Sequence, residues 1–139
     1  VDWSTDVYQL GVVFYEMLTG ENPFKADDPI GIMHNIVEKI PVPPSSLRPG
    51  IPPEIDAVIL RALEKEKAKR FRSADTMLAK LEEGLKDREK NLKHYRSMLN
   101  RALKDGMISP EEEEMLEGFR ERFGISIEEH KNIWDELDL

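Results

Sequence analysis

Cysteine is absent from the sequence, which excludes disulfide bonds and zinc sites built on thiolates. No apolar run approaches the roughly 18–20 residues that a membrane-spanning helix needs, and the first residues lack the basic region of a signal peptide. Positive charge is scarce, since 28 acidic residues outnumber 20 lysines and arginines and give a formal net charge of −8. A nucleic-acid or anionic-membrane footprint needs clustered positive charge. We therefore expect a cytoplasmic protein with no nucleic-acid or membrane partner.

Apolar residues, by contrast, are plentiful enough for a core. They make up 40% of the 139 residues, and a further 35% are charged and suit the surface. A chain of this length suits one domain, or one domain with a small appendix. Because apolar residues recur at helical spacing along it, the expected fold class is all-α.

The first expected helix lies in DVYQLGVVFYEMLTGENPF, residues 6–24. Thr5 or Asp6 can cap its start by accepting hydrogen bonds from the first backbone N–H groups. Gly20 can end it in a left-handed conformation, and Pro23 cannot continue it. The apolar residues at helical spacing are Leu10, Val13, Phe14, Met17 and Leu18. With Val12 added, the helix is apolar on much of its circumference, so it belongs in the middle of a domain.

Further helices follow along the chain. A second is expected over residues 30–40, ended by PVPPSSLRPGIPP, which we interpret as an extended structural loop, with an SH3-type ligand as the alternative. A third opens at Pro53 and a fourth follows the cap residue Ser73. The expected buried residues of the third are Ile55, Val58, Ile59, Ala62 and Leu63, and those of the fourth are Ala74, Leu78, Leu81 and Leu85.

The apolar stripe lapses around KDREKN, residues 86–91, and resumes with Leu92, Tyr95, Leu99 and Leu103. The lapse is either a solvated helical bridge or a domain boundary. One continuous helix over residues 74–104 would be about 46 Å long, which exceeds one small core. We therefore divide the chain into domains 1–88 and 89–139.

The second domain is expected to hold three short helices. Ser109 is the cap of one, with Pro110 at its first position and glutamates in its first turn. Ser126 repeats the device, with Glu128 and Glu129 behind it. The expected core residues are Leu99, Leu103, Met115, Leu116, Phe119, Phe123, Ile133, Trp134 and Leu137.

The turn before Ser109 contains part of a calcium-loop pattern. Asp105 and Glu112 fall at the fifth and twelfth positions of an EF-hand loop, but Arg101 and Leu103 occupy the first and third positions, where calcium needs oxygen ligands. Calcium binding is therefore not expected. The stretch DGMISPEE loosely resembles the turns of tellurite-resistance-type (TerB-like) helical domains.

Two stretches in residues 1–85 carry a clearer resemblance: DVYQLGVVFYEMLTGENPF, and then PPEIDAVILRALEKEKAKRFRSADTMLAKLE. In this order and at this spacing they resemble the last third of a eukaryotic-type Ser/Thr protein kinase domain. The resemblance implies the helices F to I of its C-terminal lobe, followed here by a tail resembling a three-helix bundle.

The resemblance also assigns roles to residues of the first helix. Asp6 matches the aspartate whose carboxylate anchors the catalytic loop, and Val13 and Met17 match positions that support the hydrophobic spine. Glu16 matches a position that contacts basic substrate residues in some kinases. Each has a plain structural role as the alternative: a helix cap for Asp6, core packing for the two apolar residues, and for Glu16 a local partner, which a carboxylate on an apolar helix needs.

Arg70 matches the arginine that pairs with the glutamate of the Ala-Pro-Glu motif, which does not occur in this sequence. Removing one partner of a buried ion pair costs about 3–5 kcal/mol. We therefore expect Arg70 either to turn out to water or to find another acid, and the chain to be strained or under-packed there. A bidentate acidic partner from within the chain would contradict this.

The resemblance implies a parent enzyme that uses ATP and Mg²⁺ to phosphorylate protein hydroxyls. The Gly-rich loop, the strand lysine, the catalytic-loop Asp and Asn and the Asp-Phe-Gly motif that this chemistry needs do not occur in these residues. His34, His94 and His130 are far apart in sequence and suggest no metal cluster. We expect no catalytic, cofactor-binding or metal-binding residue in this chain.

The expected function is therefore the C-terminal part of a Ser/Thr kinase. In this reading it supplies the scaffold of the catalytic loop and substrate cleft, with a helical tail for regulation or docking, and is itself inactive. Its partners would be the rest of the kinase domain and a protein substrate. The alternative is a non-catalytic, kinase-derived interaction module that binds a protein partner or self-associates through exposed apolar surface.

Overall fold

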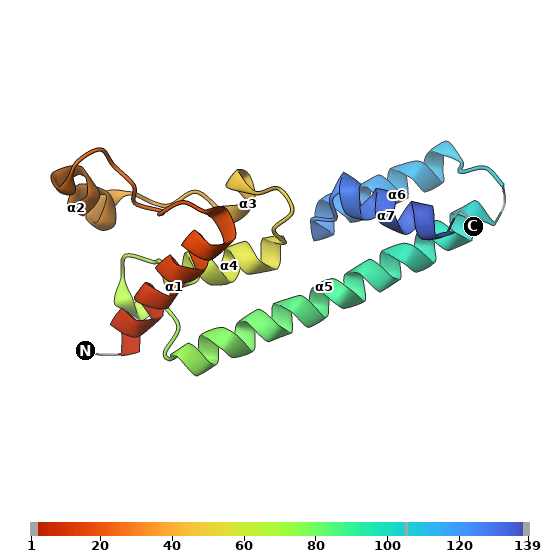
Figure 1. Ribbon diagram of the computed structural model, residues 1–139. Coiled ribbons are helices and arrows are strands. Elements are labelled where there is room, and N and C mark those ends of the chain that lie inside the picture. The colour runs from red at the N-terminus through yellow and green to blue at the C-terminus, as the bar shows by residue number, and fades with distance from the viewer. Residues whose placement is uncertain (1–2, 105, 138–139) are drawn as a thin grey trace. The chain divides into compact units, whose positions relative to one another are not determined.

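The computed structural model describes residues 3–104 and 106–137, and over these residues it contains helices and no strand (Figure 1). This confirms the all-α class. The helices are α1 (Trp3–Thr19), α2 (Pro29–Glu38), α3 (Pro44–Leu47), α4 (Pro53–Ala62), α5 (Ala74–Leu103), α6 (Pro110–Phe123) and α7 (Ile127–Leu137), with a 3₁₀ turn at Lys67–Lys69. Asp105, part of the calcium-loop pattern, lies outside the described residues.

The chain divides into two compact units, residues 1–84 and 85–139. The division falls slightly earlier than the expected one after residue 88, so residues 85–88 go with the second unit. α5 remains helical through the segment 86–91, where the apolar stripe lapses.

α1 ends as its sequence indicates. Gly20 follows the helix with a φ of 76°, and its N–H donates to the carbonyl of Glu16 at 2.8 Å. The expected start was wrong. The backbone is already helical at Trp3, so Thr5 and Asp6 lie inside the first turn of the helix and not at its N-cap position.

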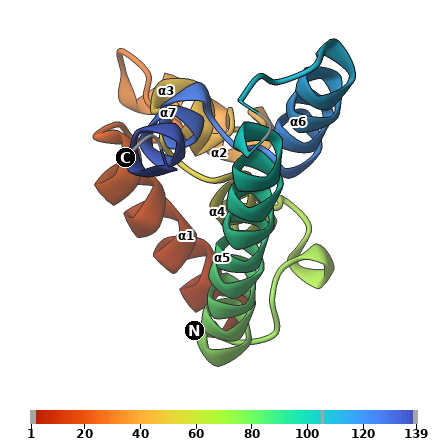
Figure 2. The ribbon, with the colours of Figure 1, turned by 90° about the vertical axis from the view of Figure 1, so that its right-hand side faces the viewer.

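The buried face of α1 also differs from the expected stripe. Its fully buried residues are Ser4, Val7, Gly11, Tyr15 and Thr19, whereas Val13, Met17 and Leu18 are exposed. Gly11 explains the orientation, because a Cβ at this position would lie 2.9 Å from the Cβ of Ala62. α1 and α4 therefore approach each other through the smallest residue of α1, and Figure 1 shows the two helices crossing. In Figure 2 most of α4 is hidden behind α5. The face of α1 that packs on α4 is therefore set by the small side chains that allow a close approach, and not by the stripe with the most apolar side chains.

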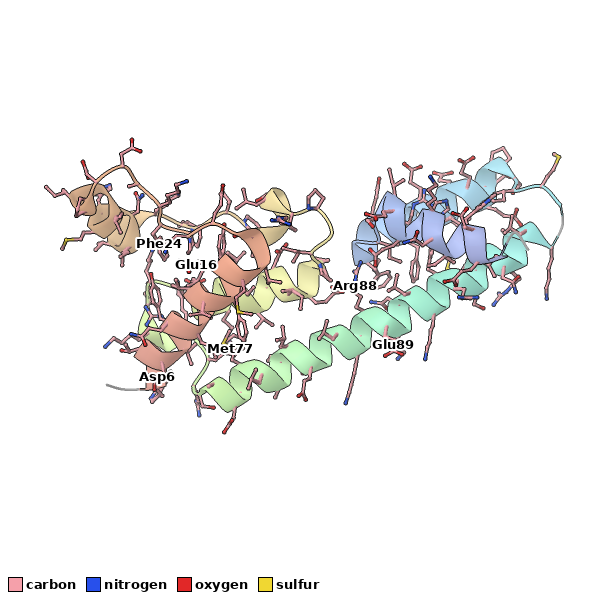
Figure 3. The ribbon with its side chains drawn as sticks, in the orientation of Figure 1. Asp6, Glu16, Phe24, Met77, Arg88 and Glu89 are labelled. Atoms are coloured by element: carbon pink, nitrogen blue, oxygen red, sulfur yellow. The ribbon has the colours of Figure 1, made fainter. Side chains whose placement is uncertain are left out.

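The core of the first unit forms around α4. The expected stripe of this helix is confirmed, since Val58, Ile59, Ala62 and the following Leu63 are buried and Ile55 packs against them. Met77, on the first turns of α5, is completely buried and lies in the same core as Val7 and Phe71 (Figure 3). The expected stripe of α5 was therefore wrong in part: only Leu81 packs against this core, while Ala74, Leu78 and Leu85 are exposed.

The proline-rich loop is less extended than expected. It contains the short helix α3, and side chains from two other helices hold it in place. Tyr15 of α1 donates its hydroxyl hydrogen to the carbonyl of Val42 at 2.8 Å. The buried carboxylate of Asp56 in α4 accepts from the backbone N–H of Ser45 at 2.9 Å and from its hydroxyl.

The second unit confirms both expected caps. Ser109 and Glu112 exchange side-chain hydrogen bonds with each other's backbone N–H groups, and Ser126 and Glu129 do the same at the start of α7. Its buried core is Tyr95, Leu99, Ala102, Leu116 and Ile125, and every other expected core residue except Met115 packs against it. Met115 is 65% exposed, so its assignment to the core was wrong.

Candidate functional site

The residues that the kinase resemblance singles out on α1 lie on the surface of the first unit. Asp6 is in the first turn and Glu16 near the last, so the two carboxylates are not brought together (Figure 3). Val13 is 48% exposed and Met17 is 73% exposed. The plain reading of these two as core residues was therefore wrong for this chain.

Glu16 has a local partner. Its carboxylate accepts a hydrogen bond from the side-chain amide of Asn22 at 2.6 Å, and the amide oxygen of Asn22 accepts from the backbone N–H of Phe24 at 2.8 Å. The pair braces the turn that follows α1, and Phe24 turns inward to the core. Glu16 therefore has the local partner expected of a carboxylate on this helix, although its side chain is exposed and not buried.

Next to Met17 the first unit carries an apolar hollow of about 440 Å³, which we call the α1 groove. Its walls come from α1, α4, the loop before α4 and α5. They include Phe14, Met17, Leu18, Ile51, Ile55 and Leu81. Soluble proteins rarely leave contiguous apolar patches uncovered, so this groove is a candidate contact surface.

Arg70 is bonded to backbone carbonyls of the described residues in place of the expected carboxylate. Its guanidinium donates to the main-chain carbonyls of Glu64 at 2.7 Å, Ser4 at 3.2 Å and Lys65 at 3.4 Å. It also lies 4.6 Å from the ring centre of Tyr8. Over the described residues, backbone carbonyls and an aromatic face take the place of the expected carboxylate, while the side chain stays partly exposed to water.

Lys65 sits beside Arg70 and was missed by sequence reasoning. Its ammonium donates to the carbonyls of Asn35 and Ile36 near the end of α2, at 3.3 and 2.7 Å, and lies 4.2 Å from the ring centre of Phe24. Burial, and then the positive charge of Arg70, lower the pKa of Lys65. Nothing in the polar stretch EKEKAKRF separates this lysine from its exposed neighbours, so no sequence signal was available.

Tyr8 completes this group of cations and aromatic rings. Its ring stacks on Phe24 with centres 6.0 Å apart, and its hydroxyl is buried without a hydrogen-bond partner among the described residues. Burial raises the pKa of Tyr8, and the charge of Arg70 offsets part of that rise. Tyr8, Phe24, Lys65 and Arg70 together connect α1 to the segments before α2 and α5. Their role is therefore structural.

In the second unit the hydroxyl of Tyr95 bridges two side chains from other helices. It is hydrogen-bonded to Nδ1 of His130 in α7, and it accepts from Arg120 of α6 at 2.6 Å. Burial, and then the positive charge of Arg120, lower the pKa of His130. Sequence reasoning did not find these partners of His130, because a contact between residues far apart in the chain leaves no local pattern.

Two classes of function can be tested directly on the described part of the chain. It contains no cluster of three or more His, Asp or Glu side chains that could hold a metal ion. Within the same residues, none of the helices combines the length and the apolar character needed to cross a membrane.

The comparisons with known proteins cover between 55% and 62% of the chain. No family model matches. The serine/threonine-protein kinase PknB of Mycolicibacterium smegmatis is 47% identical over 81 residues, which are 58% of this chain and 13% of the relative. PksC of Streptomyces coelicolor is 40% identical over 77 residues, 55% of this chain and 14% of that kinase. A probable Ser/Thr kinase of Clostridium perfringens, CPE1738, is 35% identical over 86 residues, 62% of this chain and 13% of that protein.

These relatives confirm the resemblance to Ser/Thr protein kinases over 58% of the chain. The chain spans only about an eighth of their length, as the 13% coverage shows. The similarity of the second unit to TerB-like domains stays a prediction.

Proposed function

We propose that the first unit is the part of a Ser/Thr kinase that supports the catalytic loop and the floor of the substrate cleft. The whole kinase would transfer the γ-phosphate of ATP to protein hydroxyls, with ATP and Mg²⁺ held by its other parts. The chain by itself would be inactive. The support for kinase ancestry is the 35–47% identity to Ser/Thr kinases.

The observation that carries the proposal is the uncovered apolar side of α1. Val13 and Met17 are exposed, and the α1 groove lies beside Met17. The buried side of the same helix packs against α4 and α3. A helix that is packed on one side and apolar on the other suits a position between two parts of a domain. The rest of the kinase domain is the partner that fits this surface.

Asp6 and Glu16 have separate proposed roles at the two ends of that helix. Asp6 is exposed in the first turn and would accept hydrogen bonds from the backbone of the catalytic loop. Glu16 would contact a basic residue of the substrate, exchanging its bond to Asn22 for the stronger charge-assisted one.

The test is complementation. The chain is mixed with the segment of the Mycolicibacterium relative that precedes the matched residues, and phosphate transfer from ATP to a Ser/Thr peptide is measured. We expect transfer from the mixture and none from either piece. Met17→Asp should abolish it, because a carboxylate would be buried at the contact. Met107→Asp, at an exposed methionine of the second unit, is the matched control and should leave it intact.

A mixture in which both pieces are folded and associated but transfer no phosphate would contradict the proposal. So would equal transfer with Met17→Asp and with Met107→Asp. In the same proposal the second unit, which has its own core, serves as a regulatory or docking module.

A second candidate function rests on a different surface. α2 has no buried residue, and Ile30, Met33 and Val37 are among its most exposed side chains. Such a helix suits a non-catalytic interaction module that binds a partner or a second copy of the chain. Sedimentation equilibrium at high concentration tests self-association: a strict monomer counts against it, and a dimer lost on Met33→Lys supports it.

A further inference from the structure

One side of α6 in the second unit carries four exposed residues in a row along the helix: Glu111, Met115, Gly118 and Arg122. They follow one another at intervals of four, three and four residues, so they share one side of the helix. We call this row the α6 stripe. Met115 is its apolar member and is 65% exposed. Among the ion pairs of the described residues, none involves Glu111 or Arg122.

Gly118 lies in the interior of α6, where glycine makes a helix less stable than alanine would. A Cβ added there would have nothing within 4 Å, so the packing of the chain does not require glycine. A residue that weakens its own helix without such a reason indicates a functional position. In the first unit Gly11 shows what a helical glycine can do, because it lets α4 approach α1 closely. Gly118 leaves the same kind of space on an exposed helix.

The α6 stripe is complementary to a reversed copy of itself. Glu111 and Arg122 lie equally far from its centre in sequence, and so do Met115 and Gly118. When two such helices meet in antiparallel orientation around a twofold axis, each residue lies opposite its counterpart from the other half of the stripe. Glu111 of each copy then faces Arg122 of the other, and Met115 faces Gly118. Each methionine fills the space above a glycine, and opposite charges meet at both ends.

We propose that the α6 stripe is the contact through which two copies of this chain form an antiparallel, twofold-symmetric dimer. A hollow of about 300 Å³ beside Met115, whose lining includes Met98, Ala102 and Leu116, adds apolar surface to the contact. Methionine side chains suit such a surface because they are flexible and adapt to the partner. The contact is separate from the one considered for α2, and it does not depend on the kinase function.

The dimer should be weak. Glu114 and Glu121 lie beside the stripe, and antiparallel pairing brings Glu114 of one copy near Glu121 of the other, where like charges repel. The formal net charge of −8 on each chain adds to this repulsion. A contact made mainly by one helix from each copy is also smaller than that of a stable dimer. We therefore expect a dissociation constant on the order of 100 μM.

Sedimentation equilibrium of the full chain at up to about 1 mM, ten times the expected dissociation constant, measures the dimer. Every protein carries Met33→Lys, so that association through α2 does not contribute. Gly118→Ala should weaken the dimer about tenfold, because its methyl group takes the space of the opposite methionine. The same variant should resist urea better as a monomer, because alanine favours the helix. Met115→Ala should also weaken the dimer, whereas the control Met107→Ala, at another exposed methionine, should not.

Exchanging the two charges tests the antiparallel pairing. Glu111→Arg and Arg122→Glu should each weaken the dimer about tenfold, because each places like charges opposite one another at both ends. The double variant restores opposite charges and should restore the dimer. A purely structural effect gives another order, since both exchanges oppose the helix dipole and would do most harm together. Glu113→Arg is the matched control: it makes the same change in the same turn, about 200° around the helix from Glu111, and should not weaken the dimer.

A folded chain that stays monomeric at about 1 mM overturns the proposal, since at least half of it should then be dimeric. A dimer that is equally strong in Gly118→Ala, or that the double exchange does not restore, also overturns it and places the contact on another surface. General electrostatic repulsion predicts that Glu111→Arg strengthens association, because it reduces the net negative charge by two. That result would overturn the pairing as well. None of these outcomes bears on the complementation test of the kinase function.

Discussion

Arg88 of α5 donates to the carboxylate of Glu129 in α7, and the same carboxylate oxygen accepts from the backbone N–H of Ser126 at 3.0 Å. Arg88 also donates to the carbonyls of Phe123 and Gly124, at 3.4 and 3.2 Å, where α6 ends. One arginine side chain, only 8% exposed, thereby ties the turn between α6 and α7 to α5. The glutamate both caps its own helix and neutralises the buried cation.

Replacing Arg88 by methionine should destabilise the second unit by about 3 kcal/mol, since two carbonyls and a partly buried carboxylate lose their donor. Urea unfolding followed by Trp134 fluorescence, in a Trp3→Phe background, measures the change. The matched control is Arg96→Met, which removes the exposed pair with Glu136 and should cost at most about 1 kcal/mol. Equal losses for the two variants would show that Arg88 is no anchor.

Gly11 and Gly118 predict opposite effects of the same change to alanine. At Gly11 the new Cβ would meet the Cβ of Ala62 at 2.9 Å, a contact between two helices that no flexible side chain can relieve. We expect a loss of about 1–3 kcal/mol from overpacking, measured by urea unfolding and by amide exchange in α1. At Gly118 nothing lies within 4 Å, so alanine should stabilise α6 by about 0.5–1 kcal/mol. A neutral Gly11→Ala would contradict the close crossing of α1 and α4.

The second unit should lose stability in mild acid because of His130. Its pKa is lowered from 6.5 in the folded state by burial and by Arg120, so the unfolded chain takes up a proton first as the pH falls. Stability from this group is therefore full above about pH 6.5, declines as the pH falls from there, and levels off below the folded-state pKa. Protonated His130 could no longer accept from Tyr95, whose hydroxyl would then face two cations.

The measurement is urea unfolding of the second unit at a series of pH values, for wild type and for His130→Gln. The carboxylates titrate alike in both proteins, so the difference between the two curves isolates the histidine. We expect that difference to change as the pH falls below about 6.5. Parallel curves over this range would show that protonation of His130 is not coupled to folding.

Several helix ends, though not the start of α1, were predictable because they depend on neighbouring residues. Gly20 ends α1, and Ser109 and Ser126 begin α6 and α7, with the hydrogen bonds that their sequence context indicates. The hydrogen bonds of a cap join residues within about one helical turn, so a short stretch of sequence contains all the groups that form them.

The faces and partners of the helices were harder, because they depend on residues far apart. The stripe through Val13 and Met17 is the most apolar side of α1, but the close contact of Gly11 with Ala62 turns another side toward α4. Arg70 likewise donates to backbone carbonyls. Every residue has such a carbonyl, so the sequence cannot indicate which ones will be the acceptors. The residues around Arg88 are mostly charged, so the sequence suggests a solvent-exposed segment. Arg88 is buried because the turn between α6 and α7 packs against it.

Asp56 provides the last prediction, which concerns the loop before α4. Its carboxylate accepts from both the backbone N–H and the hydroxyl of Ser45, and it is among the buried polar side chains. Asp56→Ala would leave that N–H without an acceptor, so we expect a loss of about 1–3 kcal/mol and faster amide exchange at Ser45. Ser45→Ala removes only the hydroxyl and should cost less, because the N–H still reaches Asp56. If Ser45→Ala were the more harmful change, the backbone contact could not be what holds α3 in place.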